Sequence, residues 1–179
     1  MLVIGAGAIG LFTALSARFE GIDVTLCDIS SKKLEFATTI GLTQSFVSHG
    51  MQDFSEEVKR RTDGEGFDVT VEAVGLPETF QECIDAVAFG GKVILIGVSA
   101  KPLDFFFTMI QKKELSVFGS RNAVKEDFMD VIRLFTSHPE IDAILKKVVS
   151  RTYPMSEANQ AFEALVKSGE NLIKVELKF

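Results

Sequence analysis

The sequence of 179 residues predicts an α/β fold, in which a doubly wound parallel sheet is followed by a smaller α/β extension. Three observations support this prediction. Apolar segments of strand length alternate with segments of helical periodicity over the first hundred residues. Glycines stand where the first strand must turn sharply into a helix. One later strand is apolar almost throughout, as parallel strands between two helix layers are.

The first turn carries the pattern Gly-x-Gly-x-x-Gly directly after the apolar strand 2–4. Gly5 permits the tight turn, Gly7 leaves room for a pyrophosphate, and Gly10 lets the helix pack against the strand. The N–H groups of residues 8–11 then lie at the positive end of a helix, where they stabilise an anion. Together with the strand that follows, this pattern indicates dinucleotide binding.

A second strand over 23–27 ends at Asp28, about where the dinucleotide-binding pattern has an acid. At the strand tip this carboxylate accepts hydrogen bonds from the ribose hydroxyls of adenosine and repels a 2′-phosphate. We therefore expect NAD rather than NADP. Lys32 and Lys33 would also suit a phosphate pocket, but the preceding acid argues against one, and Lys32 is expected in a solvated helical turn.

The later elements follow from hydrophobic periodicity and from the positions of Gly and Pro. Helices are expected from residue 31 to Gly41, from 53 to 61, from 77 to 89, from 126 to 137 and after Ser156. Strands are expected over 45–47, 67–74, 92–98, 115–118, 148–153 and 173–179. The charged face of the helix over 53–61 is expected to be solvated.

Two further glycines, Gly75 and Gly97, fall at the tips of the fourth and fifth strands. Ligands of such sheets bind outside the carboxyl ends of the strands, so both glycines can let the backbone approach the nicotinamide half of a cofactor. Each can equally be an ordinary turn glycine.

Three consecutive phenylalanines, 105–107, cannot all face one core, and the last strand of the sheet, 115–118, is an unpaired edge. We therefore expect a homo-oligomer formed through this edge. In the helix over 126–137, Phe128, Val131, Ile132 and Phe135 are expected to face inward.

A net charge of −6 and a pI near 5.0 argue against nucleic acid or an anionic membrane as partners. No run of eighteen apolar residues is present, so we expect no membrane span and a cytoplasmic protein. Cys27 and Cys83 match no metal-binding spacing and are expected to be core thiols, and neither His49 nor His138 is assigned a catalytic or metal role.

These motifs, in this order and spacing, resemble the cofactor-binding half of the medium-chain, zinc-dependent alcohol and polyol dehydrogenases. The resemblance covers essentially the whole chain. The matching segments are 5–11, Asp28 with Lys33, 64–68, 72–75, 90–93, 112–115, 119–121, 153–154, 161–162 and 173–175. Residues 119–122 look most like the branch that acts on sugar acids and polyols.

The resemblance implies a Rossmann-type NAD-binding domain over 1–119 and a segment over 120–179 that packs against a GroES-like catalytic domain. That catalytic domain would supply the zinc ligands and is absent from this sequence, so the chain looks like a fragment that is inactive alone, and its substrate would be an alcohol, polyol or sugar acid. Three groups of residues would bind the cofactor. Gly5, Gly7, Ala8, Ile9 and Gly10 would hold the pyrophosphate, Asp28 and Lys33 the ribose, and Val74, Gly75, Ile96, Gly97 and Val98 the nicotinamide side, while Arg121 either reaches the pyrophosphate or is a surface residue.

Two other functions remain open from the sequence. A free-standing regulatory module that senses NAD(H) would carry the same glycine loop and the same acid after the second strand. A site for FAD or a methyl donor is also compatible with the glycine loop alone, although the Gly90-Gly91-Lys92 turn disfavours it.

Overall fold

The structure is a computed structural model that describes residues 1–167 and 172–179. It consists of two compact units, residues 1–122 and residues 123–179. The first unit holds the glycine loop and every residue expected to bind a cofactor.

The first unit contains a six-stranded sheet in the order β3-β2-β1-β4-β5-β6, in which every strand pair is parallel. This order is that of a doubly wound dinucleotide-binding sheet and confirms the predicted fold class. The elements are β1 (Leu2–Ile4), α1 (Ala8–Phe19), β2 (Thr25–Asp28), α2 (Ser31–Thr39), β3 (Ser45–Val47), α3 (Met51–Thr62), β4 (Phe67–Glu72), α4 (Pro77–Ala86), β5 (Val87–Leu95), α5 (Thr108–Lys112) and β6 (Ser116–Gly119).

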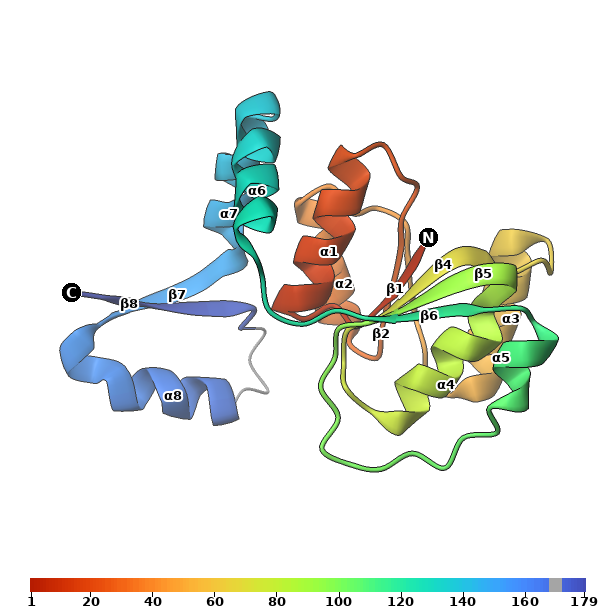
Figure 1. The fold of residues 1–179 in the computed structure, drawn as a ribbon. Coiled ribbons are helices and arrows are strands. Elements are labelled where there is room, and N and C mark those ends of the chain that lie inside the picture. The colour runs from red at the N-terminus through yellow and green to blue at the C-terminus, as the bar shows by residue number, and fades with distance from the viewer. Residues whose placement is uncertain (168–171) are drawn as a thin grey trace. The chain divides into compact units, whose positions relative to one another are not determined.

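Helices cover both faces of this sheet, with α1 and α2 on one face and α3, α4 and α5 on the other (Figure 1). Strands β1 and β2 are buried along their whole length, as expected between two helix layers. The core on the α3 and α4 side includes Leu2, Ile4, Phe46, Phe54, Ile84 and Val93. Burial of these side chains holds the carboxyl ends of the strands in one row.

Strand β1 is the centre of the sheet, because it pairs with β2 on one side and with β4 on the other. Val3 lies opposite Leu26 in β2 and opposite Val71 in β4. The strand order reverses at this point, so the helices that follow β1 and β4 leave the sheet toward opposite faces. A crevice for a ligand is expected outside the carboxyl ends of β1 and β4.

Helix α4 ends three residues earlier than the sequence predicts, at Ala86. Val87 already pairs with Phe67 of β4, and the chain then bulges through Gly90, which has a φ of 69°. The Nζ of Lys113 donates to the carbonyls of Ile84, Asp85 and Val87 at 2.8–3.0 Å. The bonds to Ile84 and Asp85 satisfy helix-end carbonyls that have no intrahelical partner, and so stabilise the end of the helix at this point.

Strand β5 was predicted to continue to residue 98, but it ends at Leu95, and it is buried only in part. The three phenylalanines that follow have different environments. Phe105 packs edge-on against Phe80, with ring centroids 5.0 Å apart. Phe106 and Phe107 are 73% and 65% exposed, in agreement with the expectation that the three rings cannot share one core.

The second unit pairs β7 (Val149–Pro154) with β8 (Lys174–Lys178) in a parallel two-stranded sheet. Its helices are α6 (Lys125–Ser137), α7 (Glu140–Val148), the 3-10 turn η1 (Met155–Glu157) and α8 (Ala158–Lys167). Helix α7 was not predicted from the sequence, although acidic residues in its first turn and lysines in its last turn are typical of a helix.

The apolar stripe of α6 does not face inward as predicted. Phe128, Val131, Ile132 and Phe135 are between 39% and 63% exposed, and no residue of α6 is buried. Helical spacing predicted the stripe correctly, but spacing does not say what covers it.

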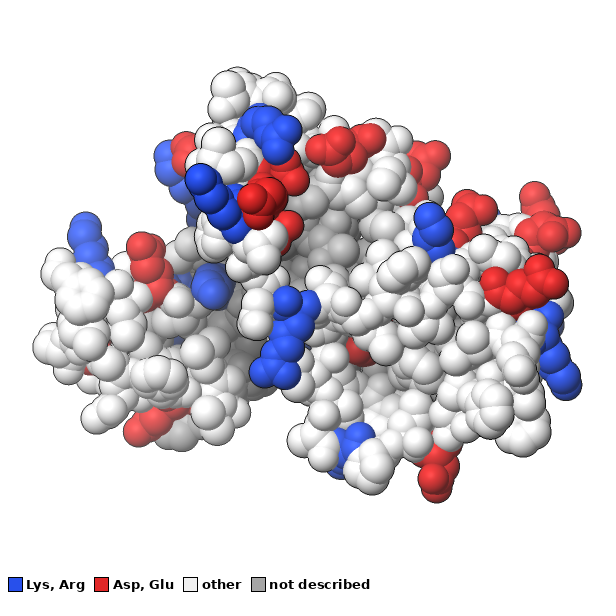
Figure 2. Space-filling model, in the orientation of Figure 1, with Lys and Arg blue, Asp and Glu red and all other residues white. Residues whose placement is uncertain are grey.

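Charged side chains are mixed over the face drawn in Figure 2, where lysines and arginines alternate with acids and form no continuous basic surface. The described residues contain no helix that is long and apolar enough to cross a bilayer.

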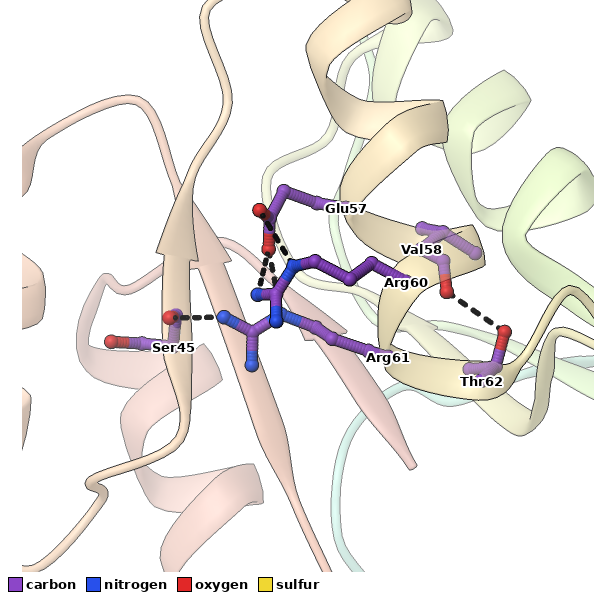
Figure 3. A network of polar contacts seen from close by, with 6 residues as sticks. All are labelled: Ser45, Glu57, Val58, Arg60, Arg61 and Thr62. Atoms are coloured by element: carbon purple, nitrogen blue, oxygen red, sulfur yellow. Dashed lines mark hydrogen bonds and ion pairs between the residues drawn. The ribbon is translucent and has the colours of Figure 1, made fainter.

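The charged face of α3 was expected to be solvated, but Arg61 instead ties the helix to β3 (Figure 3). Its Nη2 donates to the carbonyl of Ser45 at 2.8 Å, and its Nε donates to Glu57 at 2.9 Å. Its guanidinium also lies 5.1 Å from the ring centroid of Phe46. Arg60 donates to the same carboxylate and, with Arg61, holds the pKa of Glu57 below its usual value, against the effect of burial.

We predict that Arg61→Met lowers the free energy of unfolding by about 1–2 kcal/mol, because the Ser45 carbonyl and the Glu57 carboxylate lose a charged donor. Arg60→Met is the matched control, since its side chain is 63% exposed against 19% for Arg61. We expect it to cost less than about 0.5 kcal/mol. Urea denaturation measures both changes, and equal effects would show that Arg61 does not anchor the helix.

Candidate functional site

The turn between β1 and α1 uses its three glycines for three different reasons. Gly5 has a φ of +105°, a conformation that L side chains rarely adopt. A Cβ on Gly10 would lie 1.8 Å from the carbonyl oxygen of Gly5, so the helix can approach the strand only without a side chain. A Cβ on Gly7 would meet nothing within 4 Å, so Gly7 borders open space.

Helix α1 presents an uncompensated positive end to that space. The residue before it, Gly7, has no side chain to cap the helix, and no acidic residue lies in the first turn. The backbone N–H groups of Ala8, Ile9 and Gly10 at the start of a helix have no intrahelical acceptor. The geometry therefore suits an anionic group such as a pyrophosphate.

Asp28, at the end of β2, is joined to the glycine turn by a hydrogen bond. Its Oδ2 accepts from the Ala6 N–H at 2.7 Å, and its Oδ1 accepts from the Ser30 N–H at 2.9 Å. The Nζ of Lys33 lies 3.7 Å from Oδ2. A carboxylate has about four acceptor positions, so Asp28 keeps capacity for further donors while its orientation is fixed.

The turn and Asp28 border one cleft of about 530 Å³. It lies outside the carboxyl ends of β1, β2, β3 and β4, and its far wall is the first two turns of α4. Ile29 and Val74 line it as apolar walls and are 79% and 44% exposed. The remaining lining residues are Ile4, Gly5, Cys27, Lys33, Ser48, His49, Gly50, Leu76, Glu78, Thr79 and Glu82.

The ends of β4 and β5 are locked together beside this cleft by Glu72. Its Oε1 accepts from the N–H groups of Val74 and Gly75, each at 2.8 Å, and from the hydroxyl of Thr79 at 2.7 Å. Its backbone carbonyl accepts from the N–H groups of Ile96 and Gly97 at 2.9 and 3.0 Å. One buried acid thereby fixes both turns.

Positions 75 and 97 must both be glycine, because the backbones of the two turns lie in direct contact. A Cβ on Gly97 would lie 2.3 Å from the Gly75 nitrogen and 2.2 Å from Glu72 Oε2. A Cβ on Gly75 would lie 2.7 Å from the Val98 carbonyl oxygen, and Gly75 has a φ of +88°. Close backbone packing thus explains why both positions are glycine. A contact with nicotinamide is not needed to explain them and would be an additional role.

The structure therefore brings Gly5, Asp28, Lys33 and Val74 into one cleft, with Gly7, Ala8, Ile9 and Gly10 in the adjoining turn. Ile96, Gly97 and Val98 follow β5 beside Gly75. Arg121 is exposed beyond β6 and does not line the cleft.

Four residues in or beside the cleft were not predicted individually as site residues: Ile29, His49, Glu72 and Glu82. For two of them a signal was present. Ile29 is a large apolar residue directly after the strand-end acid, and Glu72 is an acid inside an otherwise apolar strand.

Both cysteines are buried and free, as expected of core thiols. Burial raises the pKa of each thiol, and nearby carboxylates add to the effect, so neither is a reactive thiolate near neutral pH. Among residues 1–167 and 172–179, no three His, Cys, Asp or Glu side chains are grouped so as to hold a metal ion. These residues therefore do not fit a catalytic zinc.

The sequence model of the family described as zinc-binding dehydrogenase matches residues 8–137. This chain belongs to that family. The match confirms the resemblance to the medium-chain zinc-dependent alcohol and polyol dehydrogenases, and this family binds NAD and zinc. Within it, the part described here corresponds to the cofactor-binding region.

Two curated relatives illustrate the similarity. An L-galactonate-5-dehydrogenase of Escherichia coli K12 is 29% identical over 179 residues, which are 100% of this chain and 52% of the relative. A sorbitol dehydrogenase of Halalkalibacterium halodurans is 33% identical over 173 residues, which are 95% of this chain and 49% of the relative. The chain thus spans about half the length of these curated relatives.

A solved structure has the same fold. The crystal structure of an alcohol dehydrogenase from Thermotoga maritima superimposes with a TM-score of 0.86 at 24% identity, over 98% of this chain and 48% of that one. At this level of identity the similarity concerns the fold alone.

We predict that Gly10→Ala destabilises this dehydrogenase domain by about 1–3 kcal/mol, because the new Cβ would overlap the Gly5 carbonyl oxygen. Gly7→Ala is the control, since its Cβ would enter open space, and it should change stability by less than about 1 kcal/mol. Thermal unfolding followed by circular dichroism measures both. A Gly10→Ala variant as stable as the wild type would contradict the close packing.

Proposed function

We propose that this chain is the NAD(H)-binding part of a zinc-dependent dehydrogenase that transfers hydride between a secondary alcohol and NAD. The observation that carries the proposal is the pairing of the Ala6 N–H with the Asp28 carboxylate. That 2.7 Å bond joins the glycine turn from which α1 starts to the strand-end acid, and Gly5 of this turn lines the cleft together with Asp28. Pyrophosphate and ribose are adjacent in a dinucleotide, so one ligand can use both groups.

The cleft accommodates the adenosine half of the cofactor. The pyrophosphate meets the N–H groups of Ala8, Ile9 and Gly10, in the space that the missing side chain of Gly7 leaves open. The ribose hydroxyls donate to the acceptor positions of Asp28 that Ala6 and Ser30 leave free. Ile29 and Val74 then provide apolar surfaces for the two faces of the adenine ring.

The nicotinamide side of the site is proposed at the adjoining strand ends, formed by Val74, Gly75, Ile96, Gly97 and Val98. The hydrogen bonds that Glu72 accepts hold the turns after β4 and β5 rigid, and rigid turns favour accurate placement of a reacting ring. Arg121 is proposed as a second contact for the pyrophosphate.

The charge of Asp28 favours NAD over NADP. A 2′-phosphate would lie against a carboxylate whose two oxygens already serve backbone N–H groups and cannot turn away without breaking those bonds. Lys33 offsets part of this repulsion, but at 3.7 Å it is paired with the same carboxylate.

Bound NAD would supply the hydride acceptor. The described residues bind and orient it, and they carry no ligand set for zinc. We therefore expect the chain by itself to bind NAD(H) without oxidising an alcohol. The names of the relatives, L-galactonate-5-dehydrogenase and sorbitol dehydrogenase among them, support a polyol or sugar acid as the substrate class of the whole protein.

Fluorescence titration with NADH tests the proposal. We predict that Gly7→Val folds normally, because Gly7 has an extended conformation next to open space, and that it weakens NADH binding at least tenfold by filling the pyrophosphate position. Failure of the wild-type chain to bind NADH would contradict the proposal, as would unchanged affinity of Gly7→Val.

The ratio of NADPH to NADH dissociation constants tests the role of Asp28. We predict that Asp28→Asn lowers this ratio about tenfold, since the variant removes the charge that repels the 2′-phosphate and keeps an acceptor oxygen for Ala6. Lys32→Gln, in the exposed first turn of α2, is the control and should leave the ratio unchanged. Tighter binding of NADPH than NADH by the wild type would refute the role.

Self-association through the edge of the sheet is also proposed. Every residue of β6 is exposed, and Phe118, Phe106 and Phe107 are more than half exposed nearby in the chain. An unprotected edge beside apolar side chains favours pairing with a second copy.

Light scattering should detect a concentration-dependent dimer that Phe118→Asp disrupts by placing a charge at the contact. A strict monomer at high concentration would contradict this proposal.

In the whole protein, residues 120–179 are proposed to pack against the catalytic domain. The exposed apolar stripe of α6 is the surface that most requires such a partner.

A further inference from the structure

One partly buried acid in the cleft contributes no hydrogen bond or ion pair to the fold described here. Glu82, in the second turn of α4, lines the cleft and is partly buried. Among the described residues, no donor and no cation pairs with its carboxylate. By contrast, the other two buried or partly buried acids at this edge, Asp28 and Glu72, each accept two or more hydrogen bonds.

The surroundings of Glu82 destabilise its ionised carboxylate. Burial raises the pKa of this carboxyl, and the charges of Asp85 and Glu78 raise it further. An ionised group in this position is stabilised by any ligand that brings a hydrogen-bond donor. The cleft is therefore prepared for a ligand group that donates.

The position of Glu82 points to the base of the dinucleotide. The glycine turn takes the pyrophosphate and Asp28 takes the ribose, so the base extends between Ile29 and Val74 toward α4. Stacking between two apolar side chains does not distinguish one purine from another. The edge of the base must therefore be recognised by a polar group, and Glu82 and Glu78 are the acids that α4 contributes to this wall.

We propose that Glu82 makes the cleft selective for adenine, because its carboxylate accepts a hydrogen bond from the 6-amino group of the base. This inference rests on the proposed NAD(H) binding. Adenine has an amino donor at position 6, whereas hypoxanthine has a carbonyl oxygen there, which would face the carboxylate as a second acceptor. Of the two acids, Glu82 is the partly buried one and Glu78 is exposed, so Glu82 is the better shielded from water.

The test compares NADH with its analogue that contains hypoxanthine in place of adenine, both titrated by fluorescence under the same conditions. For the wild type we expect the hypoxanthine analogue to bind about tenfold more weakly. In Glu82→Gln the side-chain amide can donate to the 6-carbonyl, so the two ligands should bind with nearly equal affinity. Circular dichroism verifies that the variant is folded.

Glu78→Gln is the matched control, because it removes the same charge from the same helix one turn earlier. It should preserve the tenfold preference. Loss of the preference in Glu78→Gln, or its retention in Glu82→Gln, would overturn the assignment to Glu82. Equal binding of both ligands to the wild type would overturn the inference but leave the proposed function intact. Binding of neither ligand would overturn both.

Discussion

The hydrogen bond from the Ala6 N–H to the Asp28 carboxylate is the interaction on which the site depends. It joins the turn after β1 to the end of β2, two segments that are 22 residues apart in the chain. Because Asp28 is buried among backbone donors, its charge is fixed in position rather than free to move in solvent. A short charged hydrogen bond of this kind orients both the glycine turn and the acid.

A second acid has a comparable role at the neighbouring strands. Glu72 joins the turn after β4 to the turn after β5 through three side-chain and two backbone hydrogen bonds. Gly75 and Gly97 must lack side chains because this arrangement brings their backbones into contact. The carboxyl edge of the sheet is thus rigid on both sides of the point where the strand order reverses, which is where a ligand is expected in this fold.

The sheet of the first unit has two kinds of edge, the carboxyl ends of its strands and the free side of β6. They differ in which polar and apolar groups lack a partner. At the carboxyl edge, the first N–H groups of α1 have no capping side chain, and among the described residues nothing donates to Glu82, which lines the cleft. At the lateral edge, β6 has a neighbour on one side only and apolar side chains in solvent. The first pattern suits a small polar ligand and the second suits another protein surface.

The sequence by itself determined the fold class, the glycine turn and Asp28, because each depends on short-range rules. Strand and helix periods are local, Gly5 needs its conformational freedom within one turn, and the strand-end acid follows at a fixed spacing. The family resemblance extended these rules to the other residues that are expected to bind a cofactor. The end of α4 at Ala86, the anchoring of α3 by Arg61 and the exposure of the α6 stripe were not predictable, because they depend on groups distant in sequence, such as Lys113 and the carbonyl of Ser45. Only the tertiary structure decided that Gly75 and Gly97 touch each other and that Glu82 faces the cleft with no donor among the described residues, since hydrogen bonding and close packing between distant segments leave no periodic signal in a sequence.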